Sequence, residues 1–283
     1  MSAAILVAAL LPVFVCTRAG DTGPSIAWDE REVTLRRSGG AAELEEGDIA
    51  AVLARSATTW TAAGGCTDVE VVVGEPTDSR VVGFDWAAGA GSPDNENIVI
   101  FRNDTEGEEL DTWVHAIGAL AITTVTYETH EGRLLDADIE VNDTRFYFTA
   151  CDPGGCAIDF DLENTLTHEL GHVLGLDHSA DTTATMFASA PRADLSKRDL
   201  AADDINAICT VYPDGELSGE CYGVPREAPP DVRFSPTLCS AGSLGSSLPI
   251  LLLLAGVRSG RRRGGARSAR LGGADVGVAD LPG

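Results

Sequence analysis

The chain has 283 residues, 44% of them hydrophobic, which is enough apolar content for one or two domains with a buried core. Its formal net charge is -24, and the body is more acidic than this because a cluster of arginines follows residue 257. A body this acidic would repel nucleic acid, so we exclude DNA and RNA as partners.

The N-terminus carries an apolar run from Ala3 to Val15 that is too short to cross a bilayer and is followed by small residues. This pattern predicts a secretory signal peptide at residues 1–19, cut after Ala19. Lipidation of Cys16 is the alternative, although Val15 stands where a small residue is expected. Export predicts a secreted or cell-surface protein.

An oxidising compartment would allow the six cysteines after residue 19 to pair. Cys151 and Cys156 flank the turn sequence DPGG, which predicts a local disulfide. Cys209 and Cys221 flank the end of the domain and are the next expected pair. Cys66 is then left without an obvious partner.

Apolar patterning predicts an α+β domain at residues 20–213. Alternation or short apolar runs bounded by Gly-, Pro- and Asp-rich loops predict five strands, at 26–35, 69–73, 97–101, 121–127 and 136–142. Helical spacing predicts three helices, at 49–60, 161–174 and 201–211. Asp161 is the expected N-cap of the second helix, and Gly175 lets the chain turn away from its end.

The composition changes after Pro213. Residues 214–236 are rich in Pro, Gly and charge and are expected to be a linker. Residues 237–263 combine an apolar run with an arginine cluster, which predicts a transmembrane or sorting tag that engages the membrane or the sorting machinery. A buried tail helix is the alternative. Residues 264–283 form a low-complexity tail.

The stretch THELGHVLGLDHS, at residues 167–179, contains three of the five histidines. His168 and His172 are four residues apart, so on a helix both face the same side and can bind one ion. Gly175 permits a left-handed backbone that would bring His178 to that ion as a third ligand. Three protein ligands leave a fourth position for water, which is the arrangement of a catalytic zinc site.

Glu169 lies one step around the helix from His168, so we expect its carboxylate to reach this water rather than the metal. It would act as the general base while zinc activates the water and polarises a carbonyl, which indicates amide hydrolysis. A helix that is simply rich in structural histidines is the alternative. The pattern fixes five positions, namely the three histidines, Glu169 and Gly175. Their coincidence by chance is too rare to favour this alternative.

These residues resemble a known family. HELGHVLGLDH matches H-E-x-x-H-x-x-G-x-x-H, the signature of the metzincin metalloproteases, and Met186 resembles their methionine turn, which supports the site without touching substrate. Ser179 is similar to the residue that marks the matrixin, or matrix-metalloprotease-like, branch. The resemblance extends over residues 26–213 and includes Asp203 and Asp204 in the last helix.

The matrixin resemblance implies a five-stranded mixed sheet with three helices and a cleft above the zinc that binds an extended peptide. The segment FASAPRADLSKRDL after Met186 would wall the pocket for the side chain following the cleaved bond. Residues 134–143 are similar to a strand of bacterial matrixin-like proteins. The tail from Cys239 resembles the C-terminal sorting tag of secreted myxobacterial proteins.

The sequence departs from matrixins at two places. The family's structural zinc needs three histidines and an aspartate, and only His115 and His130 remain, so we expect that site to be absent or altered. Calcium is one alternative cofactor and an acidic solvent-facing strand edge is another, because several oxygen-bearing side chains lie close together: Asp136, Asp138, Glu140, Asn142 and Asp143. We also expect no inhibitory pro-segment before the first strand.

Together these patterns predict a secreted or surface-anchored zinc endopeptidase that acts on protein or peptide substrates. His168, His172 and His178 would bind Zn²⁺, and Glu169 would be the base. The competing hypothesis is a catalytically inactive, zinc-stabilised binding module on the cell envelope. The presence of Glu169 favours the enzyme, because a binding module has no need of that carboxylate.

Overall fold

The computed structural model describes residues 13–41, 43–63, 65–88, 95–103, 112–150, 159–218, 220–221 and 276–282. The predicted five-stranded mixed sheet is confirmed and gains one further strand, β10. The strands lie in the order β10-β5-β6-β4-β2-β3. Their bounds are Glu32–Ser38 (β2), Glu70–Val73 (β3), Asn97–Phe101 (β4), Ala121–Glu128 (β5), Leu134–Val141 (β6) and Val276–Pro282 (β10).

Strands β2, β3, β4 and β6 run parallel to one another, whereas β5 is antiparallel to both β6 and β10. The first predicted strand begins later than expected, because residues 26–28 do not join β2. Instead the Ile26 N–H donates to the carbonyl of Thr17, and Ala27 bridges to Arg133. The other four predicted strands lie within two residues of their expected bounds.

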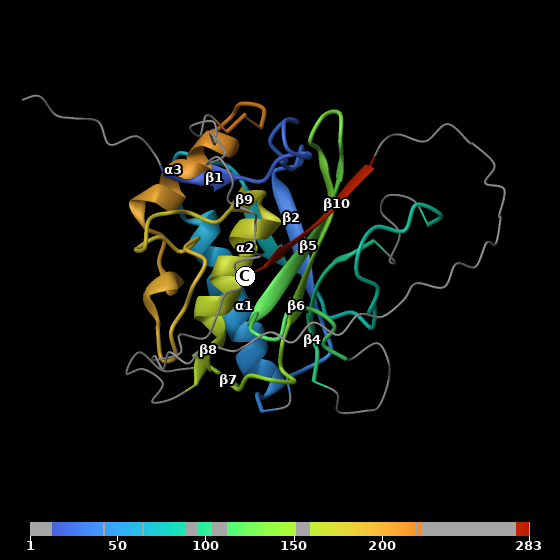
Figure 1. Cartoon of the computed structure of the whole chain (residues 1–283), viewed down its shortest axis with the longest axis vertical. Helices are drawn as coiled ribbons and strands as arrows, with labels where there is room; N and C mark the ends of the chain where they lie inside the picture. The colour runs from blue at the N-terminus through green and yellow to red at the C-terminus, as the bar shows by residue number, and fades with distance from the viewer. Residues whose placement is uncertain are drawn as a thin grey trace, which may run out of the picture.

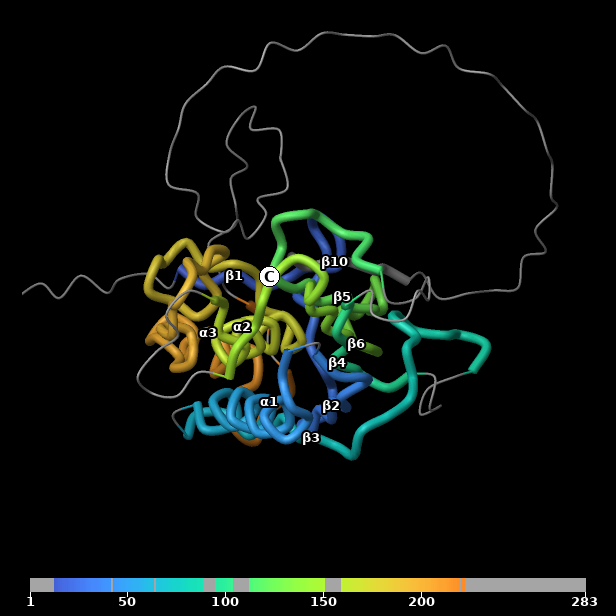
Figure 2. The backbone as a smooth tube through the Cα atoms, turned by 90° about the horizontal axis from the view of Figure 1, so that it is seen from below, coloured from blue at the N-terminus to red at the C-terminus, as the bar shows by residue number. Residues whose placement is uncertain are grey.

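The three predicted helices are also confirmed, as α1 (Glu46–Thr61), α2 (Leu162–Val173) and α3 (Ala202–Val211). Helices α1 and α2 lie side by side against one face of the sheet (Figures 1 and 2). The apolar positions of α1 repeat at helical spacing, and Ile49, Leu53 and Trp60 are fully buried in the core between these layers. Helix α1 is therefore held by burial of one apolar side, whereas every residue of α2 is buried.

Short elements complete the described structure. They are β1 (Val15–Cys16) paired with β9 (Leu176–Asp177), β7 (Phe148–Thr149) paired with β8 (Phe160–Asp161), and the 3-10 helix η2 (Ser196–Arg198). Pairing of β1 with β9 places residues 13–19, which were expected to be a leader, against the domain. Cleavage after Ala19 stays a prediction, and it would remove β1 from the domain.

Two disulfides connect distant parts of the chain, Cys16 with Cys221 and Cys66 with Cys209. The predicted Cys209–Cys221 pair is wrong. Thr67 bridges to Pro213, which brings Cys66 to the end of α3, while the Cys221 N–H bonds to the Ser25 hydroxyl beside the N-terminal segment. The bonded Cys16 has no thiol for lipidation, so that alternative is also wrong. Cys151 and Cys156 lie outside the described residues.

Within the described ranges, no helix combines the length and apolar character needed to cross a membrane. The apolar tag at 237–263 and most of the predicted linker lie outside these ranges. Residues 214–218 and 220–221 stay with the domain, where the Ser218 hydroxyl donates to the carbonyl of Trp28. Part of the predicted tail, residues 276–282, forms β10 on the outer edge of β5.

Candidate active site and metal centre

Helix α2 begins and ends at the two residues that the sequence indicated. The Asp161 carboxylate accepts the N–H of Asn164 at 2.8 Å, which is N-capping by a side chain. Gly175 follows the helix with a φ of +83°, and a Cβ there would collide with the carbonyl oxygen of Ile26. Only glycine fits this turn, and the turn leads through β9 to His178.

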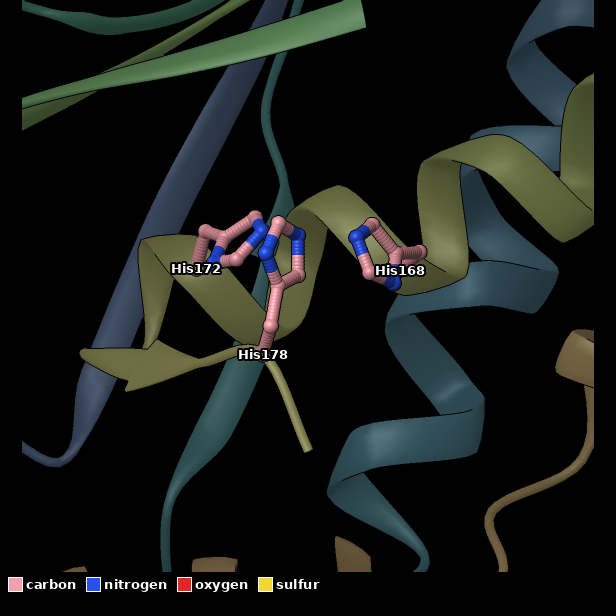
Figure 3. Close-up of side chains that lie close together, drawn as sticks. All are labelled: His168, His172 and His178. Carbon is pink, nitrogen blue, oxygen red and sulfur yellow. The ribbon is translucent and has the colours of Figure 1, made fainter. Parts of the chain in front are cut away.

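The three predicted ligands converge (Figure 3). One ligand atom from each of His168, His172 and His178 lies within 4.8 Å of the other two. The imidazole centroids are 4.9 to 5.3 Å apart, with His168 and His172 on α2 and His178 on the chain after β9. No other such group of possible metal ligands occurs in the part of the chain that the structure describes.

Hydrogen bonds at Nδ1 orient two of these imidazoles. Nδ1 of His168 lies 2.6 Å from the Thr185 carbonyl oxygen, and Nδ1 of His172 lies 2.8 Å from that of Leu176. A carbonyl oxygen can only accept a hydrogen bond, so Nδ1 carries the N–H and the neutral ring keeps its lone pair on Nε2. Nε2 of His168 is buried and has no hydrogen-bond partner among the described residues. This donor set fits a zinc ion.

The electrostatic surroundings favour the neutral ligand form of His168. Burial lowers the pKa of this imidazole well below its usual value, and the positive charge of Lys197 lowers it further. The Lys197 ammonium is itself buried, lies 3.3 Å from Nδ1 of His168 and donates to the Phe187 carbonyl. Lys197 belongs to the segment after Met186, so this segment lies against the Nδ1 side of His168.

Glu169 lies next to the histidines but is not one of the converging ligands. The Thr123 hydroxyl on β5 donates to its Oε2 at 2.6 Å, and its Oε1 is buried without a hydrogen-bond partner in the described ranges. Burial raises the pKa of Glu169 to about 8, against the opposing hydrogen bond from Thr123. No sequence pattern indicated Thr123, because its contact with Glu169 depends on how β5 packs on α2.

Met186 lies beneath the helix, as the resemblance implied, and is 2% exposed. A Cβ on Gly171 would collide with its Sδ, so the absence of a side chain at position 171 allows this close approach. The turn is held by Asp204, whose carboxylate accepts the N–H groups of Thr185 and Met186 at 2.7 and 3.0 Å. The sequence signature leaves position 171 unspecified, so it did not indicate this role.

Asp203 connects the end of the site to the N-terminal segment. One carboxylate oxygen accepts the N–H groups of Val13 and Phe14, and the other accepts the Ser179 hydroxyl at 2.6 Å. Ser179 directly follows His178, so this contact fixes the chain that carries the third imidazole. The sequence indicated Asp203 only through the family resemblance.

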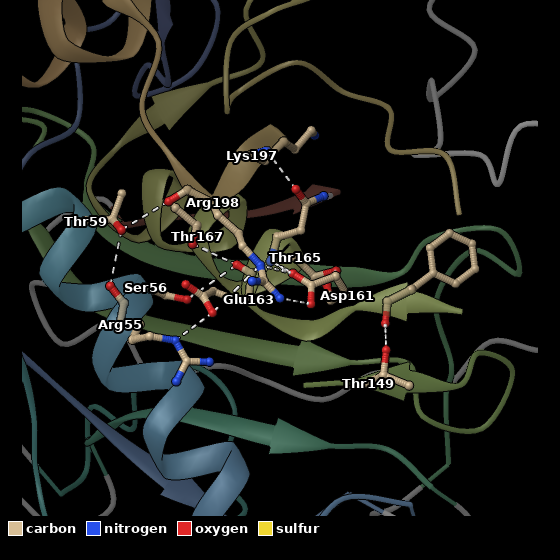
Figure 4. A network of polar contacts seen from close by, with 12 residues as sticks. Arg55, Ser56, Thr59, Thr149, Asp161, Glu163, Thr165, Thr167, Lys197 and Arg198 are labelled. Atoms are coloured by element: carbon tan, nitrogen blue, oxygen red, sulfur yellow. Dashed lines mark hydrogen bonds and ion pairs between the residues drawn. The ribbon is translucent and has the colours of Figure 1, made fainter. Parts of the chain in front are cut away.

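A polar network holds η2 and α1 on the N-terminal half of α2 (Figure 4). The Arg198 guanidinium donates to Asp161 at 2.7 Å, and that of Arg55 on α1 donates to Glu163 at 2.7 Å. The Lys197 N–H donates to the side chain of Asn164. The segment after Met186 is thus anchored to the helix that carries the histidines, and its role as a pocket wall stays a prediction.

The acidic strand β6 is not a solvent-facing edge, so that alternative is wrong. Ala137, Ile139 and Val141 face the core, and alternation places Asp136, Asp138, Glu140 and Asn142 on the opposite face, where all four are buried. Burial raises the pKa of Asp136 to about 6 and raises that of Asp138 well above its usual range, where the charge of Asp136 adds to the effect.

The protein engages the oxygens of Asp138 and Glu140, whereas both carboxylate oxygens of Asp136 are buried without a hydrogen-bond partner in the described ranges. Asp138 accepts the N–H groups of Gly83 and Ile98, and Glu140 pairs with Arg102 and with His115 at 2.9 Å. His130 is exposed and lies apart from this group. Calcium at β6 stays a prediction.

Comparison with known proteins agrees with this geometry. Residues 85–213 match the family model of the matrixins. The chain is 49% identical over 53 residues to Metalloendoproteinase 1 of Glycine max and 38% identical over 78 residues to Matrix metalloproteinase-27 of Homo sapiens. It is 30% identical over 117 residues to Metalloendoproteinase 4-MMP of Arabidopsis thaliana.

These similarities are local. They cover 19%, 26% and 41% of this chain, in the same order, and 17%, 15% and 30% of the length of the three relatives. The chain therefore spans less than a third of each relative. The match to the matrixin family model is confined to residues 85–213.

Proposed function

We propose that the matrixin domain at residues 85–213 is a zinc-dependent endopeptidase domain, in which His168, His172 and His178 bind Zn²⁺ and Glu169 is the general base. The observation that carries this proposal is the convergence of the three imidazoles beside a carboxylate that is not one of the ligands. A structural histidine cluster would not need such a carboxylate. The names of the matching relatives, metalloendoproteinase and matrix metalloproteinase, support the same reaction class.

Each residue has a defined task in this proposal. Zinc at such a site lowers the pKa of a coordinated water to about 7 and polarises the carbonyl of the scissile bond. Oε1 of Glu169, which has no hydrogen-bond partner in the described ranges, accepts a proton from the attacking water. Thr123 holds Oε2 and so orients the carboxylate. The same carboxyl group then returns the proton to the leaving amine.

The supporting residues act through position. Thr185 and Leu176 hold two imidazoles by their carbonyls, while Gly175 turns the chain toward His178. Met186 fills the space that Gly171 leaves beneath the helix. None of these residues needs to contact substrate, so we assign them to orienting the ligands.

We further propose that the protein acts outside the cytoplasm on protein or peptide substrates. Disulfides persist in oxidising compartments, and the Cys66–Cys209 pair, which cleavage after Ala19 would leave intact, therefore supports export. Anchoring or sorting through the C-terminal tag belongs to the same proposal. It rests on the apolar and arginine-rich sequence at 237–263.

The test measures zinc content and peptide cleavage on the full chain. The parent protein should bind one equivalent of zinc at the site and cleave casein or a broad library of quenched peptides. Glu169→Gln should keep the zinc and lose about 10²–10⁴-fold in kcat/KM, because it removes the base and leaves the ligands. The matched control is Glu70→Gln at an exposed position, which should leave both unchanged.

Two results would contradict the proposal. Cleavage by Glu169→Gln at the parent rate would remove this residue from the mechanism. The second result is full zinc occupancy without any cleavage, which would favour the inactive zinc-stabilised binding module instead. It must hold in the parent and also in a variant in which β10, the strand on the outer edge of β5, is disrupted.

A further inference from the structure

Strand β10 covers the outer edge of β5. Strands β2 to β6 come from one continuous part of the chain, whereas β10 is connected to the domain through residues 222–275. Every residue of β10 has a partner on β5, from Val276 opposite Glu128 to Pro282 opposite Ile122. An uncovered edge strand offers unpaired N–H and C=O groups to any extended peptide, and here a segment of the same chain uses them.

The covered edge borders the proposed catalytic site. Thr123 on β5 donates its hydroxyl to Glu169, and the register partner of Thr123 on β10 is Leu281. The backbone of β10 around residues 280–282 therefore passes the part of β5 that holds the general base. In Figure 1, β10 runs next to β5 and ends near the label of the C-terminus.

In this arrangement the site is closed. Nε2 of all three histidines and Oε1 of Glu169 are buried, and Thr123 and Glu169 have 0% exposure. An endopeptidase must admit both an extended peptide and a water molecule to these atoms. A peptide that added itself to β5 as an edge strand would need the position that β10 occupies.

We propose that β10 is an internal inhibitor, which pairs with β5 in the place of an extended substrate and keeps the site closed. This inference rests on the proposed function, because it assigns a regulation to that same site. The inhibition is intramolecular, so the chain between residues 222 and 275 maintains a high local concentration of the strand. Cutting the chain in that interval would leave β10 on a separate peptide that can diffuse away.

The experiment disrupts β10 in the full chain. Adjacent residues of a strand direct their N–H groups to opposite sides, so Val278→Pro/Ala279→Pro removes at least one N–H that faces β5. The matched control, Gly272→Pro/Gly273→Pro, places the same two prolines just before the strand. Each protein is loaded with one equivalent of zinc, and kcat/KM is measured with a quenched peptide substrate. Amide hydrogen exchange is measured at residues 121–128.

We expect the β10 variant to show an increase in kcat/KM of about tenfold or more, equivalent to a closed state favoured by about 1.4 kcal/mol or more. Exchange at residues 121–128 should become faster in the same variant. The control should match the parent in both measurements. A synthetic peptide with the sequence VGVADLP should restore inhibition of the β10 variant and slow its exchange.

The outcomes separate this inference from the proposed function. Equal cleavage by the parent and the β10 variant, or unchanged exchange at β5, would overturn the inhibitory role while the endopeptidase assignment stands. If neither protein cleaves any peptide at full zinc occupancy, the proposed function fails and the inference fails with it.

Discussion

Two buried polar groups lie on opposite faces of the same sheet, and their difference separates a site from a structural cluster. On the helix face, Glu169 lies beside three imidazoles that converge on one point. On the other face, β6 carries Asp136 and Asp138. Burial raises the pKa of the carboxyl groups in both places.

Both oxygens of Asp136 are also buried without a hydrogen-bond partner, so the distinction is convergence: among the described residues only the three histidines form a group of converging possible metal ligands. Asp138 accepts backbone N–H groups from Gly83 and Ile98, so its oxygens hold the neighbouring chain in place. Nε2 of His168 and Oε1 of Glu169 are buried without a hydrogen-bond partner among the described residues. A shifted pKa alone therefore does not identify a catalytic group, whereas convergent lone pairs indicate a ligand.

Metal removal should give the largest difference between the two groups. Treatment with a chelator should reduce peptide cleavage to background, and one equivalent of zinc should restore it. His172→Ala should lose the zinc, whereas Asp138→Asn should keep it, as measured by metal analysis after dialysis. If Asp138→Asn lost the zinc and His172→Ala kept it, the metal would lie on the β6 face of the sheet. The proposed histidine ligands would then be wrong.

Loss of the Asp204 carboxylate should have the next largest effect, this time on stability. It accepts the N–H groups of Thr185, Met186 and Ala201, so Asp204→Ala leaves buried donors without a partner. We expect the free energy of unfolding in urea to fall by about 2–4 kcal/mol. Asp214→Ala, at an exposed position, is the control and should change it by less than about 0.5 kcal/mol. Equal effects would show that Asp204 does not hold the turn.

A smaller effect should follow from adding one methyl group beneath the histidines. Gly171→Ala brings a Cβ into Met186, so we expect a loss of about 1–3 kcal/mol in unfolding free energy together with weaker zinc binding. Gly47→Ala on α1 meets no atom within 4 Å and should be neutral or slightly stabilising. A stable Gly171→Ala with normal zinc affinity would mean that the turn moves freely.

The smallest effect should come from the acidic pair and should depend on pH. Because the folded-state pKa of Asp136 is about 6, above its ordinary 3.8, its contribution to stability is full at low pH and is lost as the pH rises through 6. Asp136→Asn should therefore gain about 1–2 kcal/mol relative to the parent between pH 5 and pH 8. Urea unfolding at both pH values measures this gain. A constant difference between the two proteins would contradict the assignment.

Helices, strands and contacts that depend on local spacing could be predicted from the amino-acid sequence. Apolar periodicity located the three helices and four of the five strands, because the buried side of an element repeats with its backbone period. The spacing of His168 and His172, with Gly175 and the following His178, predicted that these three side chains converge, since one helical turn and one left-handed residue fix their relative directions. Asp161 was recognisable as the N-cap because its role is local.

Contacts between segments that are distant in the sequence can be read only from the folded structure. The bond from Thr123 to Glu169 joins residues 46 positions apart, and the Cys16–Cys221 disulfide spans 205 positions. The approach of Met186 to Gly171 and the pairing of β10 with β5 likewise depend on how separate elements pack. Sequence spacing carries no record of such approaches, because they arise from the shapes of the assembled layers. These long-range contacts hold the carboxylate of Glu169 and cover the outer edge of β5.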